Sequence, residues 1–250
     1  MLRLAISRWL APEILRLDIG CDHLTLQYRK QMTTCQLPIP LRSGIPQQEA
    51  LDGLRSAISG LCAGMTAKKR VMEVTLSDAL VRGWIVERLP GLASPAEVEA
   101  LADFQMRALY GDDDADASDW VIRADATPFA KNWPAMALPK VLRDLLVEIA
   151  GDYGCPLARI QTRFVFSFND WQDNPFKRSN PIVLSLDTPD GLTIGIRNAA
   201  QWQALRTHPP LAILGVELPA MLRRECRAAG LHLDDCKIHS LPWQFAEKSA

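Results

Sequence analysis

The sequence predicts an α/β protein in which strands and helices follow one another along the chain. Apolar and polar residues alternate over Ile14–Ile19 and again over Leu24–Tyr28, and the short turn between these runs indicates an antiparallel hairpin. Apolar residues then recur at three- and four-residue spacing over Gln47–Cys62, which is the pattern of one helix face. A second set of strands followed by a helix begins at Ile182 and weakly repeats this order. The repetition favours two lobes.

The composition is that of a globular protein with a sizeable core. The 250 residues are 48% apolar and 23% charged, and the formal net charge is −1. This balance argues against extensive disorder and against a strongly basic nucleic-acid-binding surface. The six cysteines form no Cys-x-x-Cys pair, which indicates reduced thiols in a cytosolic protein. We find neither a secretory signal at Met1–Leu10 nor an apolar run long enough to span a membrane.

The remaining elements of residues 1–170 follow from the same patterns. Ser94 and Glu97 form a capping box around Pro95, so we expect a helix from there to about Tyr110. The strands expected in this part lie at Thr33–Ile39, Val71–Leu76, Val81–Leu89, Trp120–Ala124, Pro134–Leu138 and Ile160–Ser167, and a further helix spans Lys140 to about Asp152.

A second, smaller part is predicted from residue 171 to residue 250. Its first two strands, Ile182–Leu186 and Leu192–Arg197, flank the strong turn signal Asp187–Gly191. A helix is expected at Glu217–Ala229 and a last strand at Lys237–Leu241. We therefore divide the chain into residues 1–170 and 171–250.

Two turns could hold phosphate. Asp18-Ile19-Gly20 ends a strand, and a Gly there lets backbone N–H groups approach a phosphate while the Asp organises Mg²⁺. Asp187 and Gly191 could provide a second phosphate loop. However, Asp22 adds a carboxylate that would repel phosphate. An ordinary hairpin turn is the favoured interpretation of the first segment.

Other candidate sites fit their chemistry less well. The acidic run Asp112–Asp119 lacks the Gly and Glu that an EF-hand calcium loop needs, so we interpret it as a solvated loop. The run Lys68–Arg70 is either a solvated face or a contact with anionic lipid headgroups. No Walker A run and no Gly-x-Ser-x-Gly elbow is present. A zinc site is disfavoured because no trusted spacing fits the four possible ligands, which are Cys226, His232, Cys236 and His239.

The middle of the chain resembles a known family. The strand–Leu76-Ser77-Asp78–strand segment, and the helix that starts at Ser94-Pro95-Ala96-Glu97, resemble the cytoplasmic part of type II secretion protein L and the related PilM-type pilus assembly proteins. Further matching segments, in order, are Asp18-Ile19-Gly20, Leu109-Tyr110-Gly111, Trp120, Pro134–Leu138 and Ile160-Gln161-Thr162. The resemblance covers roughly residues 14–200.

The resemblance implies an actin-like, ribonuclease-H-type fold with mixed sheets flanked by helices in two lobes, and a helical and strand segment inserted in the first lobe. Members of this family are cytoplasmic adaptors at the inner membrane that link a secretion or pilus ATPase to membrane-embedded platform proteins. The PilM branch binds ATP and holds a peptide of a bitopic partner, whereas the protein L domain is not expected to hydrolyse ATP. Protein L continues across the membrane, and no spanning helix follows residue 241 here. We therefore expect a stand-alone subunit or the cytoplasmic part of an architecture split over two genes.

These considerations predict a non-catalytic scaffold without cofactor or metal, cytoplasmic and peripheral to the inner membrane. Its expected partners are a bitopic inner-membrane pilus or secretion protein and a secretion ATPase, not nucleic acid, and a homodimer is left open. The alternative is a PilM-type ATP-binding protein in which Asp18, Gly20, Asp187 and Gly191 surround the phosphates and Mg²⁺. A nuclease is disfavoured because Asp18 is the only strand acid suitably placed for a two-metal site.

Overall fold

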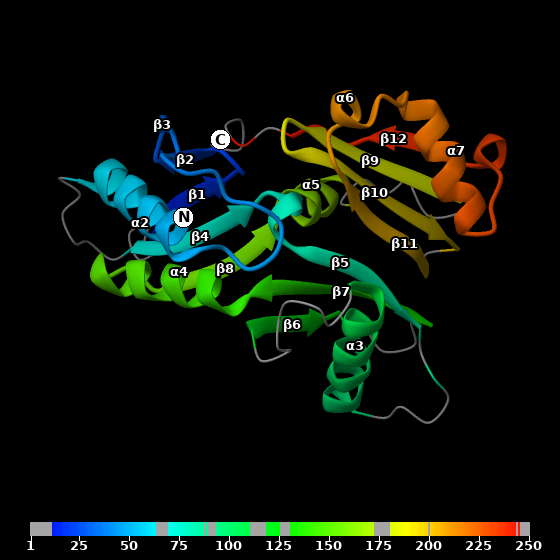
Figure 1. Ribbon diagram of the computed structural model, residues 1–250, viewed down its shortest axis with the longest axis horizontal. Coiled ribbons are helices and arrows are strands. Elements are labelled where there is room, and N and C mark those ends of the chain that lie inside the picture. The colour runs from blue at the N-terminus through cyan, green and yellow to red at the C-terminus, as the bar shows by residue number, and fades with distance from the viewer. Residues whose placement is uncertain are drawn as a thin grey trace, which may run out of the picture.

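The computed structural model describes residues 12–63, 70–87, 89, 94–110, 119–125, 131–172, 181–199, 201–243 and 245 (Figure 1). None of the helices in these ranges is long and apolar enough to cross a membrane. Residues 112–118 of the predicted acidic loop, and Lys68 and Lys69 of the basic run, lie outside the described residues.

The first sheet has five strands in the order β3-β2-β1-β4-β8. Strands β1, β2 and β3 form an antiparallel meander, and β4 and β8 run parallel to β1. Leu15 and Leu17 of β1 are buried against helices α2 and α4, which cover one face of this sheet. The bounds are β1 Glu13–Ile19, β2 His23–Tyr28, β3 Gln31–Gln36, α2 Gln48–Cys62, β4 Arg70–Leu76, α4 Lys140–Asp152 and β8 Leu157–Thr162.

A small sheet is inserted between β4 and α4. Its antiparallel strands lie in the order β5-β7-β6, and α3 packs on it through a core that includes Trp84, Val98 and Trp133. The predicted capping box is confirmed, because the Glu97 N–H donates to Ser94 Oγ at 3.3 Å and the Ser94 N–H donates to Glu97 Oε2 at 2.9 Å. The bounds are η1 Asp78–Leu80, β5 Arg82–Glu87, α3 Pro95–Tyr110, β6 Trp120–Ala124 and β7 Asn132–Pro139.

The second sheet repeats the plan of the first. Strands β9, β10 and β11 form an antiparallel meander, and β12 returns parallel to β9 after α7, in the order β11-β10-β9-β12. The repetition that the sequence indicated from Ile182 is confirmed by this topology. The bounds are β9 Ile182–Thr188, β10 Gly191–Asn198, β11 Gln201–His208, α6 Leu211–Leu214, α7 Leu218–Ala228, η3 Leu233–Asp235 and β12 Lys237–Ser240.

Two expectations fail in this part of the chain. The predicted strand Ile160–Ser167 is wrong, since β8 ends at Thr162 and helix α5 (Arg163–Gln172) begins at once. The run Arg163–Phe168 is rich in aromatic and β-branched residues, but two caps fix it as a helix. The Phe164 N–H donates to the Asp78 carboxylate at 3.0 Å, and the Val165 N–H donates to Thr162 Oγ1 at 3.3 Å. Strand β11 was not predicted, because it is a half-exposed edge strand with few apolar residues.

All six cysteines are free thiols, as expected from their spacing. The boundary proposed near residue 170 falls at the end of α5, which contacts both large sheets (Figure 1). The division into residues 1–170 and 171–250 stays a prediction.

Candidate functional site: a buried ion cluster between two hairpin turns

Three segments that are distant in sequence meet between the first and second sheets. They are the end of β1 with the turn into β2, the β9–β10 turn, and the first residue of α5. The Arg163 side chain is 1% exposed, and it lies between the side chains of Asp18 (3% exposed) and Asp190 (4% exposed). The cluster therefore joins one residue from each segment.

All three nitrogens of the Arg163 guanidinium bond a carboxylate oxygen. Its Nε and Nη2 donate to the two carboxylate oxygens of Asp18, each at 2.9 Å, which is the bidentate geometry that suits arginine. Its Nη1 donates to Asp190 Oδ2 at 2.5 Å. Burial alone would lower the pKa of Arg163, but the two carboxylates raise it, so the guanidinium stays charged.

His23 completes the cluster on the side of the first turn. Its Nε2 lies 3.1 Å from Arg163 Nη2, and its Nδ1 lies 2.8 Å from Asp22 Oδ1. Because a guanidinium only donates, Nε2 accepts and Nδ1 carries the proton that bonds Asp22. The same ring covers Gly20, where an added Cβ would lie 2.3 Å from His23 Cε1. A larger residue at position 20 would therefore displace the His23 ring from its contacts with Arg163 and Asp22.

Asp190 receives the donors that a bound anion would receive. Its Oδ1 accepts the backbone N–H of Cys21 at 3.1 Å, and its Oδ2 accepts Arg163 Nη1. Burial disfavours the charged form, yet Arg163, the Cys21 N–H and Ser77 together lower the pKa of Asp190. Burial and the neighbouring Asp190 raise the pKa of the Cys21 thiol to about 12, so this thiol is no nucleophile at neutral pH.

The predicted phosphate residues separate into two groups. Asp18 and Gly20 lie in the cluster. Asp187 is exposed and pairs in register with Leu192, away from Arg163. Gly191 is required by packing between strands, because an added Cβ would lie 2.5 Å from the His208 carbonyl oxygen of β11.

Sequence reasoning missed Arg163 and Asp190. Arg163 stood in a segment assigned to a strand, and Asp190 shared one turn signal with Asp187. The available signal for Arg163 was a charged side chain next to the apolar and aromatic run Phe164–Phe168.

The cluster contains a possible set of metal ligands, but Arg163 already bonds two of them. One ligand atom each from Asp22, His23 and Asp190 lies within 4.8 Å of the others. Arg163 already bonds Asp190 and His23, so a cation would be placed beside a guanidinium. Within the described ranges, the candidate zinc ligands Cys226, His232, Cys236 and His239 form no such group.

The Leu76-Ser77-Asp78 segment positions the helix that carries Arg163. Asp78 is buried, and both of its carboxylate oxygens face the Phe164 N–H at the start of α5. Burial raises the pKa of Asp78 to about 7, against the opposing effect of these hydrogen bonds. Asp78 therefore fixes the first turn of α5, from which Arg163 enters the cluster.

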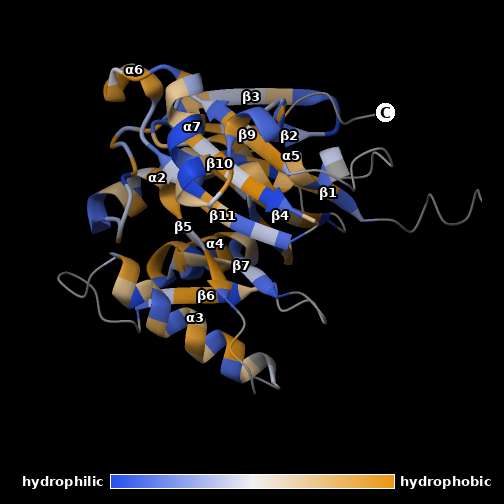
Figure 2. Ribbon diagram, turned by 90° about the vertical axis from the view of Figure 1, so that its right-hand side faces the viewer, coloured by the Kyte–Doolittle hydropathy of each residue, from blue (hydrophilic) through white to orange (hydrophobic). Residues whose placement is uncertain are grey.

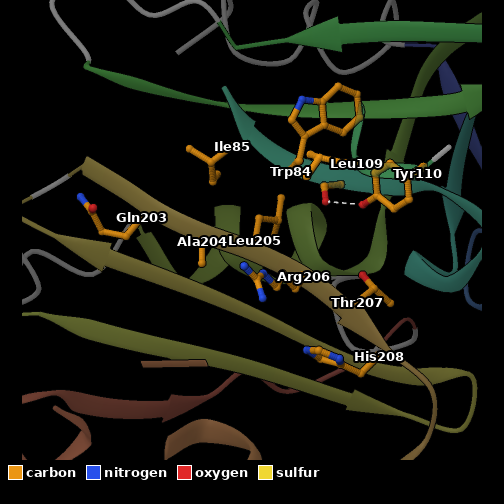
Figure 3. Close-up of a pocket in the computed structure, with 11 residues that line it drawn as sticks. Trp84, Ile85, Leu109, Tyr110, Gln203, Ala204, Leu205, Arg206, Thr207 and His208 are labelled. Atoms are coloured by element: carbon orange, nitrogen blue, oxygen red, sulfur yellow. Dashed lines mark hydrogen bonds between the residues drawn. The ribbon is translucent and has the colours of Figure 1, made fainter. Parts of the chain in front are cut away.

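A separate cavity of about 490 Å³ lies where β5 of the small sheet meets β11 of the second sheet (Figure 3). Leu109 and Tyr110 at the end of α3 form one wall, and the Tyr110 hydroxyl donates to the Gly83 carbonyl at 2.9 Å. Arg206 and His208 form the opposite wall, and both approach the buried carboxylate of Glu225. The cavity is thus lined by Leu109 and Tyr110 on one side. On the other side, its basic residues Arg206 and His208 lie near a carboxylate of opposite charge.

No family model matches the sequence, and no curated protein matches it. Solved structures do match. A PilM–PilN type IV pilus biogenesis complex aligns over 86% of this chain and 70% of that chain, with TM-score 0.56 and 14% identity. A Bacteroides thetaiotaomicron protein with an actin-like ATPase fold and unknown function aligns over 91% of this chain and 81% of that chain, with TM-score 0.55 and 7% identity.

The fold is actin-like. The predicted fold class, mixed sheets flanked by helices, is confirmed, and so is the resemblance to PilM at the level of the fold. The cytoplasmic domain of EpsL, an inner-membrane component of the type II secretion system of Vibrio cholerae, also matches over 77% of this chain and 70% of that chain, with TM-score 0.43 and 14% identity.

Proposed function

We propose that this protein is a non-hydrolysing adaptor in the assembly platform of a type IV pilus or a type II-like secretion system. An internal ion cluster, rather than a nucleotide, connects its two large sheets. The non-hydrolysing part of the proposal rests on the buried contact of Arg163 with Asp18 and Asp190.

The cluster leaves a nucleotide phosphate without a favourable site. The Asp-x-Gly turn after β1 is the segment that would hold phosphate, and its Cys21 N–H already bonds the Asp190 carboxylate. A phosphate at this turn would be a second negative charge beside Asp190. At a separation of about 4 Å, such a pair costs about 4 kcal/mol in a partly screened environment. We therefore assign no ATP, Mg²⁺ or catalytic residue to the protein.

The adaptor role draws its support from two sources. The strand–Leu76-Ser77-Asp78–strand segment and the capped helix after Ser94 resemble PilM-type and protein L domains. The matched PilM is part of a PilM–PilN type IV pilus biogenesis complex. By analogy, the partners are a bitopic inner-membrane protein and a secretion ATPase, at the cytoplasmic face of the inner membrane.

Thermal unfolding with and without millimolar Mg-ATP tests the absence of nucleotide binding. We expect no change in Tm. A nucleotide at 100-fold excess over its Kd would stabilise the protein by about 2.7 kcal/mol, which raises the Tm of a chain of this size by about 5 °C or more. A Mg²⁺-dependent rise that Asp18→Ala abolishes would support the PilM-type ATP-binding alternative instead.

Deletion of the gene in its host tests the adaptor role separately. We expect the deletion strain to lose surface pili or the export of secreted enzymes. We expect wild type and Asp187→Ala to restore the lost function, because Asp187 is exposed and outside the cluster. Normal pili and normal secretion in the deletion strain would contradict the role, whatever the result with Mg-ATP.

A further inference from the structure

The first sheet has an unprotected edge. Strand β3 is the outermost strand, and within the described part of the chain no strand pairs with its outer side. Five of its six residues are exposed, and Met32 is 52% exposed. In Figure 2, β3 runs along the upper margin of the molecule.

The hydrogen-bond register fixes which backbone groups face outward. The Leu37 N–H donates to the Asp22 carbonyl at 2.8 Å, so these opposite residues form a hydrogen-bonded pair. Such pairs alternate along an antiparallel ladder, so Cys35, Thr33 and Gln31 direct their backbone groups to β2. The residues that direct N–H and C=O groups to the open edge are Met32, Thr34 and Gln36.

This edge lacks the usual devices against pairing. The segment Gln31–Gln36 has no charged residue and no proline, and its pairing with β2 runs without a bulge. Pairing can extend only over these residues, because the Arg29–Lys30 turn and Pro38 limit the strand at its two ends.

We propose that β3 pairs antiparallel with β3 of a second copy, around a two-fold axis at Thr34. A two-fold pair places every side chain opposite one from the same strand, so a charged edge would repel itself, and this edge has no charge. The axis at Thr34 places Thr34 opposite its own copy and Met32 opposite Gln36. All outward-facing residues then find partners. An axis at Thr33 would instead place Gln36 opposite Lys30, which lies in the turn and not in the strand. The exposed Ile39 (42% exposed) lies beyond the paired residues with either axis.

The axis can be tested by disulfide crosslinking in a Cys35→Ser background. Hydrogen-bonded antiparallel residues have Cα atoms about 5.5 Å apart, which is within the range of a disulfide. We expect Thr34→Cys to form a covalent dimer when oxidised glutathione accepts the two thiol hydrogens and electrons. Thr33→Cys is the matched control, because the axis places residue 33 opposite Ser at position 35. Equal crosslinking of both variants, or of neither, would overturn the proposal.

The mass in solution provides an independent test. We expect the wild type to sediment as a dimer, and Thr34→Lys to be a folded monomer, because two lysines would face each other in the pair. Thr33→Lys is expected to stay dimeric. A wild-type protein that remains monomeric at the highest concentration reached, or a dimer that survives Thr34→Lys, would contradict the pairing. The former result would also be expected if the edge accepts a strand of another protein.

Discussion

At the residue scale, the protein places a carboxylate of its own, Asp190, against the turn in which the sequence suggested a phosphate. Asp190 accepts a backbone N–H from the β1–β2 turn and a guanidinium N–H from α5, while Asp18 holds the same guanidinium from the other side. A buried pair of this kind contributes little net stability, but removal of one partner is costly because the other charge stays buried. The cluster therefore fixes how its three segments meet.

Asp190→Ala tests whether the Asp190 carboxylate occupies the place of a bound anion. The variant leaves the Cys21 N–H and Arg163 Nη1 without their partner, so we expect a loss of about 1–3 kcal/mol in the free energy of unfolding. Inorganic phosphate can then bind these donors, and it should raise the Tm of the variant but not of the wild type. Asp187→Ala is the control, because its side chain is exposed. A phosphate response that is equal in the three proteins would contradict the assignment.

The same residues show where sequence reasoning reaches its limit. The turn signal Asp187–Gly191 correctly predicted a hairpin, and Asp18-Ile19-Gly20 correctly indicated the end of a strand. The choice between Asp187 and Asp190 depends on the strand register, which places Asp187 opposite Leu192 and Asp190 in the turn itself. A local turn signal contains no information about which carboxylate meets a residue from another element.

At the scale of the elements, local patterns were sufficient where an element is stabilised by its own sequence. Helices α2, α3, α4 and α7 lie within a residue or two of their predicted bounds, because each has an apolar face or a capping signal. Helix α5 was missed because the Asp78 that caps it is 86 residues earlier in the chain. Tertiary capping thus overrides the strand propensity of the aromatic run.

Asp78→Asn tests how much the burial of the Asp78 carboxyl destabilises the protein at neutral pH. In the unfolded chain this carboxyl has its ordinary pKa of 3.8, whereas burial raises the folded pKa to about 7. As pH rises from about 4 to about 7, the unfolded chain releases the proton while the folded chain keeps it. The contribution of Asp78 to the free energy of unfolding therefore falls over this pH range. Each tenfold difference in proton affinity corresponds to about 1.4 kcal/mol.

An asparagine keeps an acceptor for the Phe164 N–H without the charge. We therefore expect the free energy of unfolding of Asp78→Asn, relative to wild type, to increase between pH 5 and pH 8 in urea titrations. Asp144→Asn, on an exposed face of α4, is the control and should follow the wild type. A constant difference across this pH range would show that Asp78 is ionised throughout.

At the scale of the whole molecule, α5 is the element that all three sheets share. Arg163 bonds Asp18 of the first sheet, and Phe164 is 2% exposed in a core with Leu184 and Leu186 of the second sheet. Ile85 and Met136 of the small sheet pack against that core. Phe168 also contacts Trp202 of β11, with ring centroids 5.1 Å apart. The three sheets are thus coupled through one helix, although the sequence suggested a boundary near its end.

Unfolding should therefore be a single cooperative transition, and Phe164→Ala should weaken all of it. We expect far-UV circular dichroism and tryptophan fluorescence to give one coincident urea transition for the wild type. The variant removes a buried aromatic ring and should lose about 3–5 kcal/mol, while Phe164→Leu, which leaves a smaller cavity, should lose less. If residues 171–250 were an independent unit, the two probes would separate and one transition would be unaffected by either substitution. Coincident shifts would instead place α5 at the shared core, where Asp78, Arg163 and Phe164 connect the cap, the ion cluster and the second sheet.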